Sequence, residues 1–153
     1  MRGNGDTGEG RARSTGGTVP LEIGDTVSFG KTVGESDVYL FAGITGDFSP
    51  NHVNEEAMKG TPYGRRVAHG ALSLGFASTT STMMVQRAGA SAVSYGYDKV
   101  RFVKPIFVGD TVTVTFIVEE VDERESRMRA KIEIRNQHDE LCTVAEHILK
   151  FLP

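Results

Sequence analysis

Residues 67–85, VAHGALSLGFASTTSTMMV, decide the fold, because they form the longest uninterrupted candidate helix in the chain. Small residues recur along this segment at helical spacing: Ala71, Leu74, Gly75, Ser78 and Thr82. Large apolar side chains broaden the surface: Leu72, Phe76 and Met83. A helix this apolar is expected to be buried on several sides, so another element has to cover it.

The residues before this helix predict a strand, a helix and an irregular loop. Alternation over Thr26–Val33 predicts a strand. Helical spacing over Glu35–Thr45 predicts a helix that ends at Gly46. Proline and glycine between Asp47 and Arg66 argue against a long regular element, although a short helical turn fits Glu55–Lys59.

From Ala92 onward the hydrophobic period changes to two, which is typical of strands. Alternating or apolar runs cover Val112–Val118, Met128–Ile134 and Leu141–Phe151, and short polar connections join them as in antiparallel hairpins. The predicted fold class is therefore α+β, with one curved antiparallel sheet wrapped around the long helix. Residues 1–17, rich in Gly, Arg, Thr and Ser, are expected to be a disordered tail before a single domain at 18–153.

Composition limits the partners and the compartment. The 153 residues carry 17 Lys and Arg against 20 Asp and Glu, a net charge of −3, so no general nucleic-acid footprint is expected. No apolar run is long enough to predict a membrane span. The single cysteine, Cys142, cannot form a disulfide within the chain and is expected to be a core thiol, so we expect a cytoplasmic location.

The turn Gly46-Asp47-Phe48-Ser49-Pro50-Asn51-His52 places a carboxylate and an imidazole five residues apart. An irregular turn that brings Asp47 and His52 together would form a proton-transfer pair around one water molecule. The alternative is structural: Asp47 caps the following turn, and His52 is a surface residue.

His69 and Gly70 stand at the predicted start of the long helix. The first N–H groups of a helix have no internal partners and carry positive partial charge, so they can hold an oxygen that becomes an oxyanion. The alternative is that Gly70 allows close packing of helix on sheet, while His69 caps the helix or packs.

The other histidines predict no further chemistry. His138 lies in a predicted hairpin turn and is expected in solvent, and His147 is expected in the core or at a subunit interface. The histidines and the cysteine show no metal-ligand spacing, so no metal is predicted. The glycines match no nucleotide-binding fingerprint, so no such cofactor is predicted.

Three segments together resemble the MaoC-like hydratases, the (R)-specific enoyl-CoA hydratases of the hot-dog fold. The first is residues 46–52, GDFSPNH, close to the family pattern G-D-x-N-P-x-H. The second is residues 67–71, VAHGA, and the third is residues 102–111, FVKPIFVGDT. The resemblance spans the chain from about Ile23 onward. It implies a hot-dog domain, paired into a homodimer or a higher homo-oligomer, that takes an acyl-CoA thioester as substrate and uses no further cofactor.

The resemblance also implies residue roles. Asp47 and His52 would be the catalytic pair, and the Gly70 N–H would contact the thioester oxygen. Substrate-binding candidates are Ser78 on the helix, Ser49 and Asn51 in the catalytic turn, and Arg65 and Lys104 for the CoA phosphates. Arg66 and Arg101 are further cationic candidates, and possible acyl-tunnel residues are Phe41, Phe48, Tyr63, Leu74 and Met83. Ser49 and Ala71 depart from the usual asparagine and methionine, which puts substrate length in doubt more than reaction type.

The reaction implied is reversible addition of water to a trans-2-enoyl-CoA, giving a (3R)-hydroxyacyl-CoA. Two other functions stay open from the sequence. One is an acyl-CoA thioesterase, since hot-dog folds host both chemistries. The other is a dehydratase subunit that acts on substrates bound to acyl carrier protein.

Overall fold

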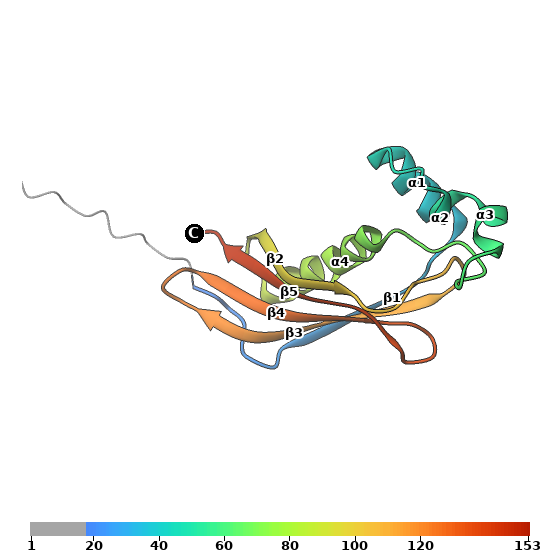
Figure 1. The fold of residues 1–153 in the computed structure, drawn as a ribbon. Coiled ribbons are helices and arrows are strands. Elements are labelled where there is room, and N and C mark those ends of the chain that lie inside the picture. The colour runs from blue at the N-terminus through green and yellow to red at the C-terminus, as the bar shows by residue number, and fades with distance from the viewer. Residues whose placement is uncertain (1–17) are drawn as a thin grey trace, which may run out of the picture.

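The sheet is built from five antiparallel strands in the order β1-β3-β4-β5-β2, and the long helix α4 lies along one of its faces (Figure 1). The computed structural model describes residues 18–153, so the predicted tail at 1–17 lies outside the described residues. The strands are β1 (Thr26–Thr32), β2 (Ala92–Phe102), β3 (Thr111–Asp122), β4 (Arg127–Arg135) and β5 (Leu141–Phe151). The helices are α1 (Glu35–Thr45), α2 (Pro50–Val53), α3 (Glu55–Lys59) and α4 (Gly70–Ala88). This is the predicted α+β class, a curved sheet against one long helix.

Helix α1 has the predicted bounds because local signals define both of its ends. The Asp37 carboxylate accepts a hydrogen bond from the Gly34 N–H at 2.8 Å before the first turn. At the other end Gly46 adopts the left-handed conformation, with φ of 80°, and its N–H donates to the Ala42 carbonyl. The chain is thereby turned out of the helix directly before Asp47.

Helix α4 begins and ends three residues later than predicted. Two long-range backbone bonds explain the late start: the Val67 N–H donates to the Asn51 carbonyl at 2.9 Å, and the Ala68 N–H donates to the Ile106 carbonyl at 2.7 Å. These bonds hold residues 67 and 68 in extended backbone between the turn at 46–52 and the loop after β2. Gly89, with φ of 62°, ends the helix.

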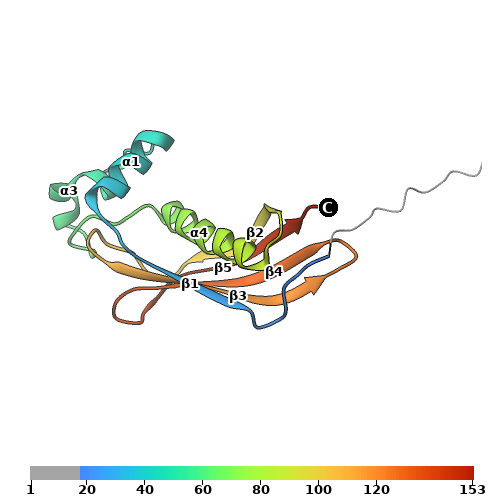
Figure 2. The same ribbon diagram turned by 180° about the vertical axis from the view of Figure 1, so that it is seen from behind.

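One face of α4 packs against the sheet, and the opposite face is exposed in the single chain. The buried residues of the helix are Ser73, Phe76, Ala77, Thr80, Ser81 and Met84. The predicted small-residue stripe falls largely on the exposed face, where Ala71, Gly75, Ser78 and Thr82 lie. The expectation of burial on several sides is therefore wrong for one chain, because the sheet covers only one face (Figure 2).

The core lies between α4 and the sheet, as the alternation of the strands requires. In β4 each second residue is buried, from Met128 to Ile134, while the charged residues between them face the other side. Cys142 is buried in this core as a free thiol, and burial raises its pKa. Among the described residues, no helix combines the length and the apolar character that crossing a membrane requires.

His147 on β5 is fully buried, which confirms its expected place in the core. Its ring stacks on Tyr97 with centroids 4.0 Å apart, and its Nε2 lies 2.8 Å from Ser94 Oγ. Its Nδ1 has no hydrogen-bond partner among the described residues. Burial lowers the pKa of His147 from 6.5 to about 4, since the charged ring would lose its hydration.

We therefore expect the protein to lose stability as pH falls from 6.5 toward 4. The unfolded chain takes up the proton in this window and the folded chain does not, so protonation favours unfolding. At about 1.4 kcal/mol per pKa unit, the full window costs about 3 kcal/mol. Urea unfolding at pH 7 and pH 5 should show a smaller pH effect in His147→Met than in the native chain. Equal pH effects in both chains would contradict the assignment to His147.

Candidate active site

The site lies at the N-terminal end of α4, where α1, α2 and α3 gather beyond the end of the helix (Figure 1). Three segments that are distant in sequence meet here: the turn at 46–52, residues 67–70 and the loop after β2. The isolated bridge between Val67 and Phe107 ties the second of these segments to the third.

The Asp47 turn is held by short-range hydrogen bonds. Asp47 Oδ1 accepts from the Ser49 N–H at 3.2 Å, and the Asp47 N–H donates to Thr45 Oγ1 at 3.3 Å. Ser49 precedes α2 without a side-chain capping bond, so its contribution to the turn is made by its backbone. The Oδ2 atom of Asp47 is left to face the histidines.

His52 is fixed in one tautomer by its surroundings. Pro50 starts the short helix α2, and this helix carries His52 into the interior, where it is 8% exposed. His52 Nδ1 lies 2.7 Å from the Val67 carbonyl, which only accepts, so Nδ1 carries the proton of the neutral ring. Nε2 is then an acceptor, consistent with the Asn51 amide nitrogen 3.4 Å away.

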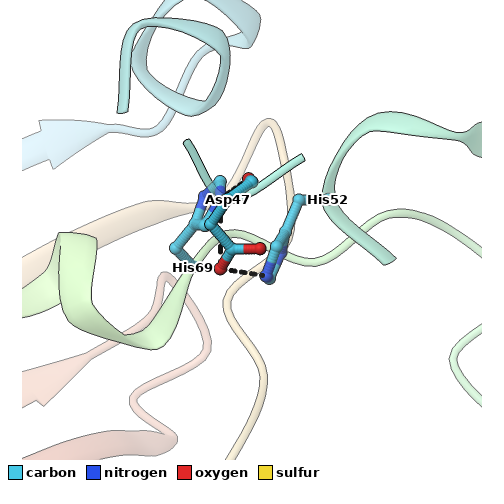
Figure 3. A group of neighbouring side chains, drawn as sticks. All are labelled: Asp47, His52 and His69. Carbon is cyan, nitrogen blue, oxygen red and sulfur yellow. Dashed lines mark hydrogen bonds and ion pairs between the residues drawn. The ribbon is translucent and has the colours of Figure 1, made fainter. Parts of the chain in front are cut away.

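The structure brings Asp47 and His52 together as predicted. Asp47 Oδ2 lies 3.9 Å from His52 Nε2 (Figure 3). The structural alternative is wrong for His52, which is buried rather than on the surface, whereas the Asp47 side chain is 53% exposed. Two acceptors at this separation can each accept a hydrogen bond from the same water molecule.

His69 is a third member of the group, and sequence reasoning did not assign it a role in the site. Its Nε2 lies 3.9 Å from Asp47 Oδ2 and 2.9 Å from the Asp47 main-chain oxygen. Its ring stacks on that of His52 with centroids 3.7 Å apart. His69 is the N-cap residue of α4, but its side chain makes no capping bond. The sequence signal for a role of His69 in the site is its position directly before Gly70.

The three side chains Asp47, His52 and His69 also have the donor atoms of a metal site, all within 4.8 Å of one another. The sequence spacing of the histidines concealed this grouping. However, His69 Nε2 must carry a proton to donate to the Asp47 carbonyl, so this nitrogen has no free lone pair for a metal. The donor set as arranged is better suited to holding and moving protons than to holding a cation.

Gly70 is the first residue of α4, and its N–H makes no hydrogen bond within residues 18–153. A Cβ at position 70 would lie 2.9 Å from Cδ2 of Phe102. The close packing of the Phe102 ring on the start of α4 therefore requires a residue without a Cβ. This contact supports the packing alternative for Gly70 alongside the oxyanion role. No local pattern indicates that Phe102, at the end of β2, provides this contact.

A cavity of about 290 Å³ opens between these segments. It is lined by both histidines, Gly70 and Phe102, and Asp47 lies beside it through its contacts with the two imidazoles. The remaining lining residues come from these three segments, the loop after α3 and β5: Asn51, Tyr63, Val67, Ala68, Val103, Lys104, Pro105, Ile106 and Thr143. The unpaired N–H of Gly70 and the His52 ring thus belong to one cavity.

The predicted cationic residues differ in their availability. Lys104 lines the cavity and pairs with Glu140 at 2.5 Å. Arg65 is half exposed, and its guanidinium stacks on Phe107 at 4.0 Å. Arg101 is exposed and donates to the adjacent Val100 carbonyl.

The Arg66 side chain is occupied by bonds within the fold. Its guanidinium bonds to Glu35 of α1 and Glu55 of α3, and it also donates to the Tyr39 hydroxyl. These bonds lower the pKa of both carboxylates and raise that of Arg66. Arg66 therefore holds α1 and α3 together on either side of the turn at 46–52, and it is not free for a phosphate.

The remaining predicted residues divide between the cavity and other parts of the described chain. Ser78 is exposed on α4, whereas Ser73 is buried and bonds to Thr143 of the lining at 3.1 Å. Of the five proposed tunnel residues, Tyr63 lines the cavity, and Phe41 packs against His69 with ring centroids 4.9 Å apart. Phe48 is exposed, Leu74 packs against the core, and Met83 is half-buried on α4.

Comparison with known proteins identifies the family. The model of the MaoC like domain matches residues 13–141. The chain belongs to the MaoC-like family. An (R)-specific enoyl-CoA hydratase of Rhodospirillum rubrum is 42% identical over 98 residues, which span 64% of this chain and 66% of that protein. A 3-hydroxybutyryl-CoA dehydratase of Methylorubrum extorquens is 36% identical over 71% of this chain and 68% of its own length.

Solved structures of related proteins have the same hot-dog fold as this MaoC-like chain. The (R)-hydratase of A. caviae involved in PHA biosynthesis superposes with a TM-score of 0.76 at 29% identity, covering 87% of this chain and 98% of that one. The monoamine oxidase regulatory protein of Archaeoglobus fulgidus gives a TM-score of 0.76 at 30% identity, covering 87% and 92%.

Proposed function

We propose that this chain is a hydro-lyase that adds water reversibly to trans-2-enoyl-CoA, giving a (3R)-hydroxyacyl-CoA. The observation that carries the proposal is the placement of two proton acceptors, Asp47 Oδ2 and His52 Nε2, 3.9 Å apart beside the unpaired N–H of Gly70. The hydratases and dehydratases among its relatives support the same reaction class.

In the hydration direction, Asp47 and His52 each accept a hydrogen bond from the water, which directs its oxygen at the β-carbon. One of the pair removes one proton from this water, and the other hydrogen stays on the new β-hydroxyl group. As the C–O bond forms, the thioester oxygen takes on the negative charge of an enolate. The Gly70 N–H and the positive end of α4 stabilise this charge. One of the pair then returns the proton to the α-carbon. Because the two groups are coupled, neither proton transfer is assigned to one residue.

For substrate binding, we propose that Arg65 and Lys104 meet the CoA phosphates. Arg65 is half exposed, and Lys104 lines the cavity, although its bond to Glu140 must open first. Asn51 also lines the cavity, and its Oδ1 is buried without a partner among the described residues. Ser49 and Ser78 remain substrate-binding candidates from the family resemblance. No further cofactor enters this reaction.

We further propose that the active form is a homodimer. Strand β2 is an edge of the sheet, and it exposes Val93 and Tyr95. The opposite face of α4 is also uncovered. An apolar free edge and a bare helix face are the features that a second copy would bury. Light scattering after size exclusion should give twice the monomer mass, and a monomer would contradict this proposal.

A cytoplasmic location remains a prediction.

A panel of enoyl-CoA substrates of rising chain length tests the function directly. Hydration should lower the absorbance of the conjugated thioester. Chiral analysis should identify the product as (3R)-hydroxyacyl-CoA. Release of free thiol without hydration would instead indicate a thioesterase. The same enoyl groups should also be supplied on acyl carrier protein. A dehydratase subunit that acts on carrier-bound substrates would turn over the carrier-bound group faster than the CoA thioester.

A further inference from the structure

His69 is buried in the group of three side chains, yet no proton transfer of the proposed reaction requires it. It is 4% exposed, and its ring turns away from the end of α4 toward Asp47 and His52 (Figure 3). A buried polar side chain carries a desolvation cost, so the contacts that it makes need an explanation.

The hydrogen bond of His69 acts on the backbone of Asp47. Nε2 donates to the Asp47 main-chain oxygen at 2.9 Å, across 22 residues of sequence. This bond links the start of α4 to the residue after the Gly46 turn. The other bonds at Asp47 are local, to Thr45 and Ser49, so His69 supplies the connection between the carboxylate and the body of the fold.

The ring of His69 acts on His52. The two imidazoles stack with centroids 3.7 Å apart and planes inclined by 26°. The His52 ring otherwise makes one short hydrogen bond, from Nδ1–H to the Val67 carbonyl at 2.7 Å, and one long contact of 3.4 Å between Nε2 and the amide of the adjacent Asn51. The long contact restrains the ring weakly, so the ring can rock about the short bond, and the stacked face of His69 limits this movement. Nε2 of His52 is thereby kept toward Asp47.

We propose that His69 is a positioning residue that holds Asp47 and His52 at the separation that accepts one substrate water. The proposal rests on the proposed hydration reaction. The hydrogen bond fixes the acid, the stacked ring fixes the imidazole, and both originate from one side chain. A displacement of about 1 Å between reacting groups can cost 10²-fold in rate, so this support is significant for catalysis.

Two substitutions separate the parts of this role. His69→Leu has neither donor nor aromatic ring, whereas His69→Gln keeps an amide N–H that can reach the Asp47 carbonyl. We expect kcat for crotonyl-CoA hydration, per folded enzyme, to fall about 100-fold in the leucine variant. We expect the glutamine variant to recover about tenfold of this loss, with KM in both variants within about threefold of native. His138→Leu, in an exposed turn, is the matched control.

A second readout does not depend on activity. Imidazole NMR should show sharp His52 ring signals of the Nδ1–H tautomer in the native chain and broadened His52 signals in His69→Leu, where the ring can rock about its bond to the Val67 carbonyl. The proposal is overturned if the leucine variant keeps sharp His52 signals and native kcat, or if leucine and glutamine lose kcat equally. If the native chain hydrates no enoyl thioester, the proposed function fails, and the NMR comparison alone decides the positioning of His52.

Discussion

Asp47→Asn and His52→Asn are each expected to lower kcat for enoyl-CoA hydration by about 10²–10⁴-fold. The asparagine at position 47 keeps an oxygen for the Ser49 N–H, so the turn should survive, but it no longer accepts a proton. The asparagine at position 52 can still donate to the Val67 carbonyl, but it lacks the basic Nε2. Both variants should therefore fold and fail at proton transfer.

Steady-state kinetics on crotonyl-CoA, with thermal melting to check the fold, measure this effect. The double variant should be little worse than either single one, because residues that act as a unit lose their function together. Asp139→Asn, in an exposed turn, is the matched control for the loss of a carboxylate. Near-native kcat in both single variants would show that the assigned roles are wrong.

The sequence predicted those elements whose signals are local. Helix α1 was placed to the residue because Gly46 must leave the helix with positive φ. Strand β4 was clear because its buried and charged residues alternate without a break. In both cases the decisive interaction spans only a few residues of chain.

Features set by long-range contacts could not be predicted in the same way. The start of α4 moved to Gly70 because the N–H groups of Val67 and Ala68 bond to other loops. Arg66 is a candidate for the CoA phosphates from the sequence, but two carboxylates from α1 and α3 bind it. The register of β2 shifts between Asp98 and Arg101, so alternation could not fix the face of Arg101.

The site was predictable in its chemistry and less so in its geometry. The resemblance placed Asp47, His52 and Gly70 in one site, and the structure brings them together. It did not indicate that the His69 ring stacks on His52 or that Phe102 packs on Gly70. Both contacts join segments more than fifteen residues apart, and no local pattern encodes them.

Gly70→Ala is expected to lower kcat/KM by about 10²–10³-fold, the loss associated with one oxyanion donor. The added methyl group would lie 2.9 Å from the Phe102 ring, in the space between two residues that line the cavity. The ring or the start of α4 must shift, and the substrate loses its approach to the N–H at position 70. The backbone conformation itself does not demand glycine, since Gly70 is not among the positive-φ residues.

Removing the Phe102 ring separates the two reasons for the glycine. Phe102→Ala relieves the clash, so Gly70→Ala/Phe102→Ala should regain the melting temperature of Phe102→Ala alone. If the glycine serves the approach of the thioester oxygen, the double variant should still show most of the loss in kcat/KM relative to Phe102→Ala. If the glycine serves only packing against the ring, the double variant should match Phe102→Ala in kinetics as well. The second outcome would remove Gly70 from the catalytic site and leave the enolate oxygen to another donor.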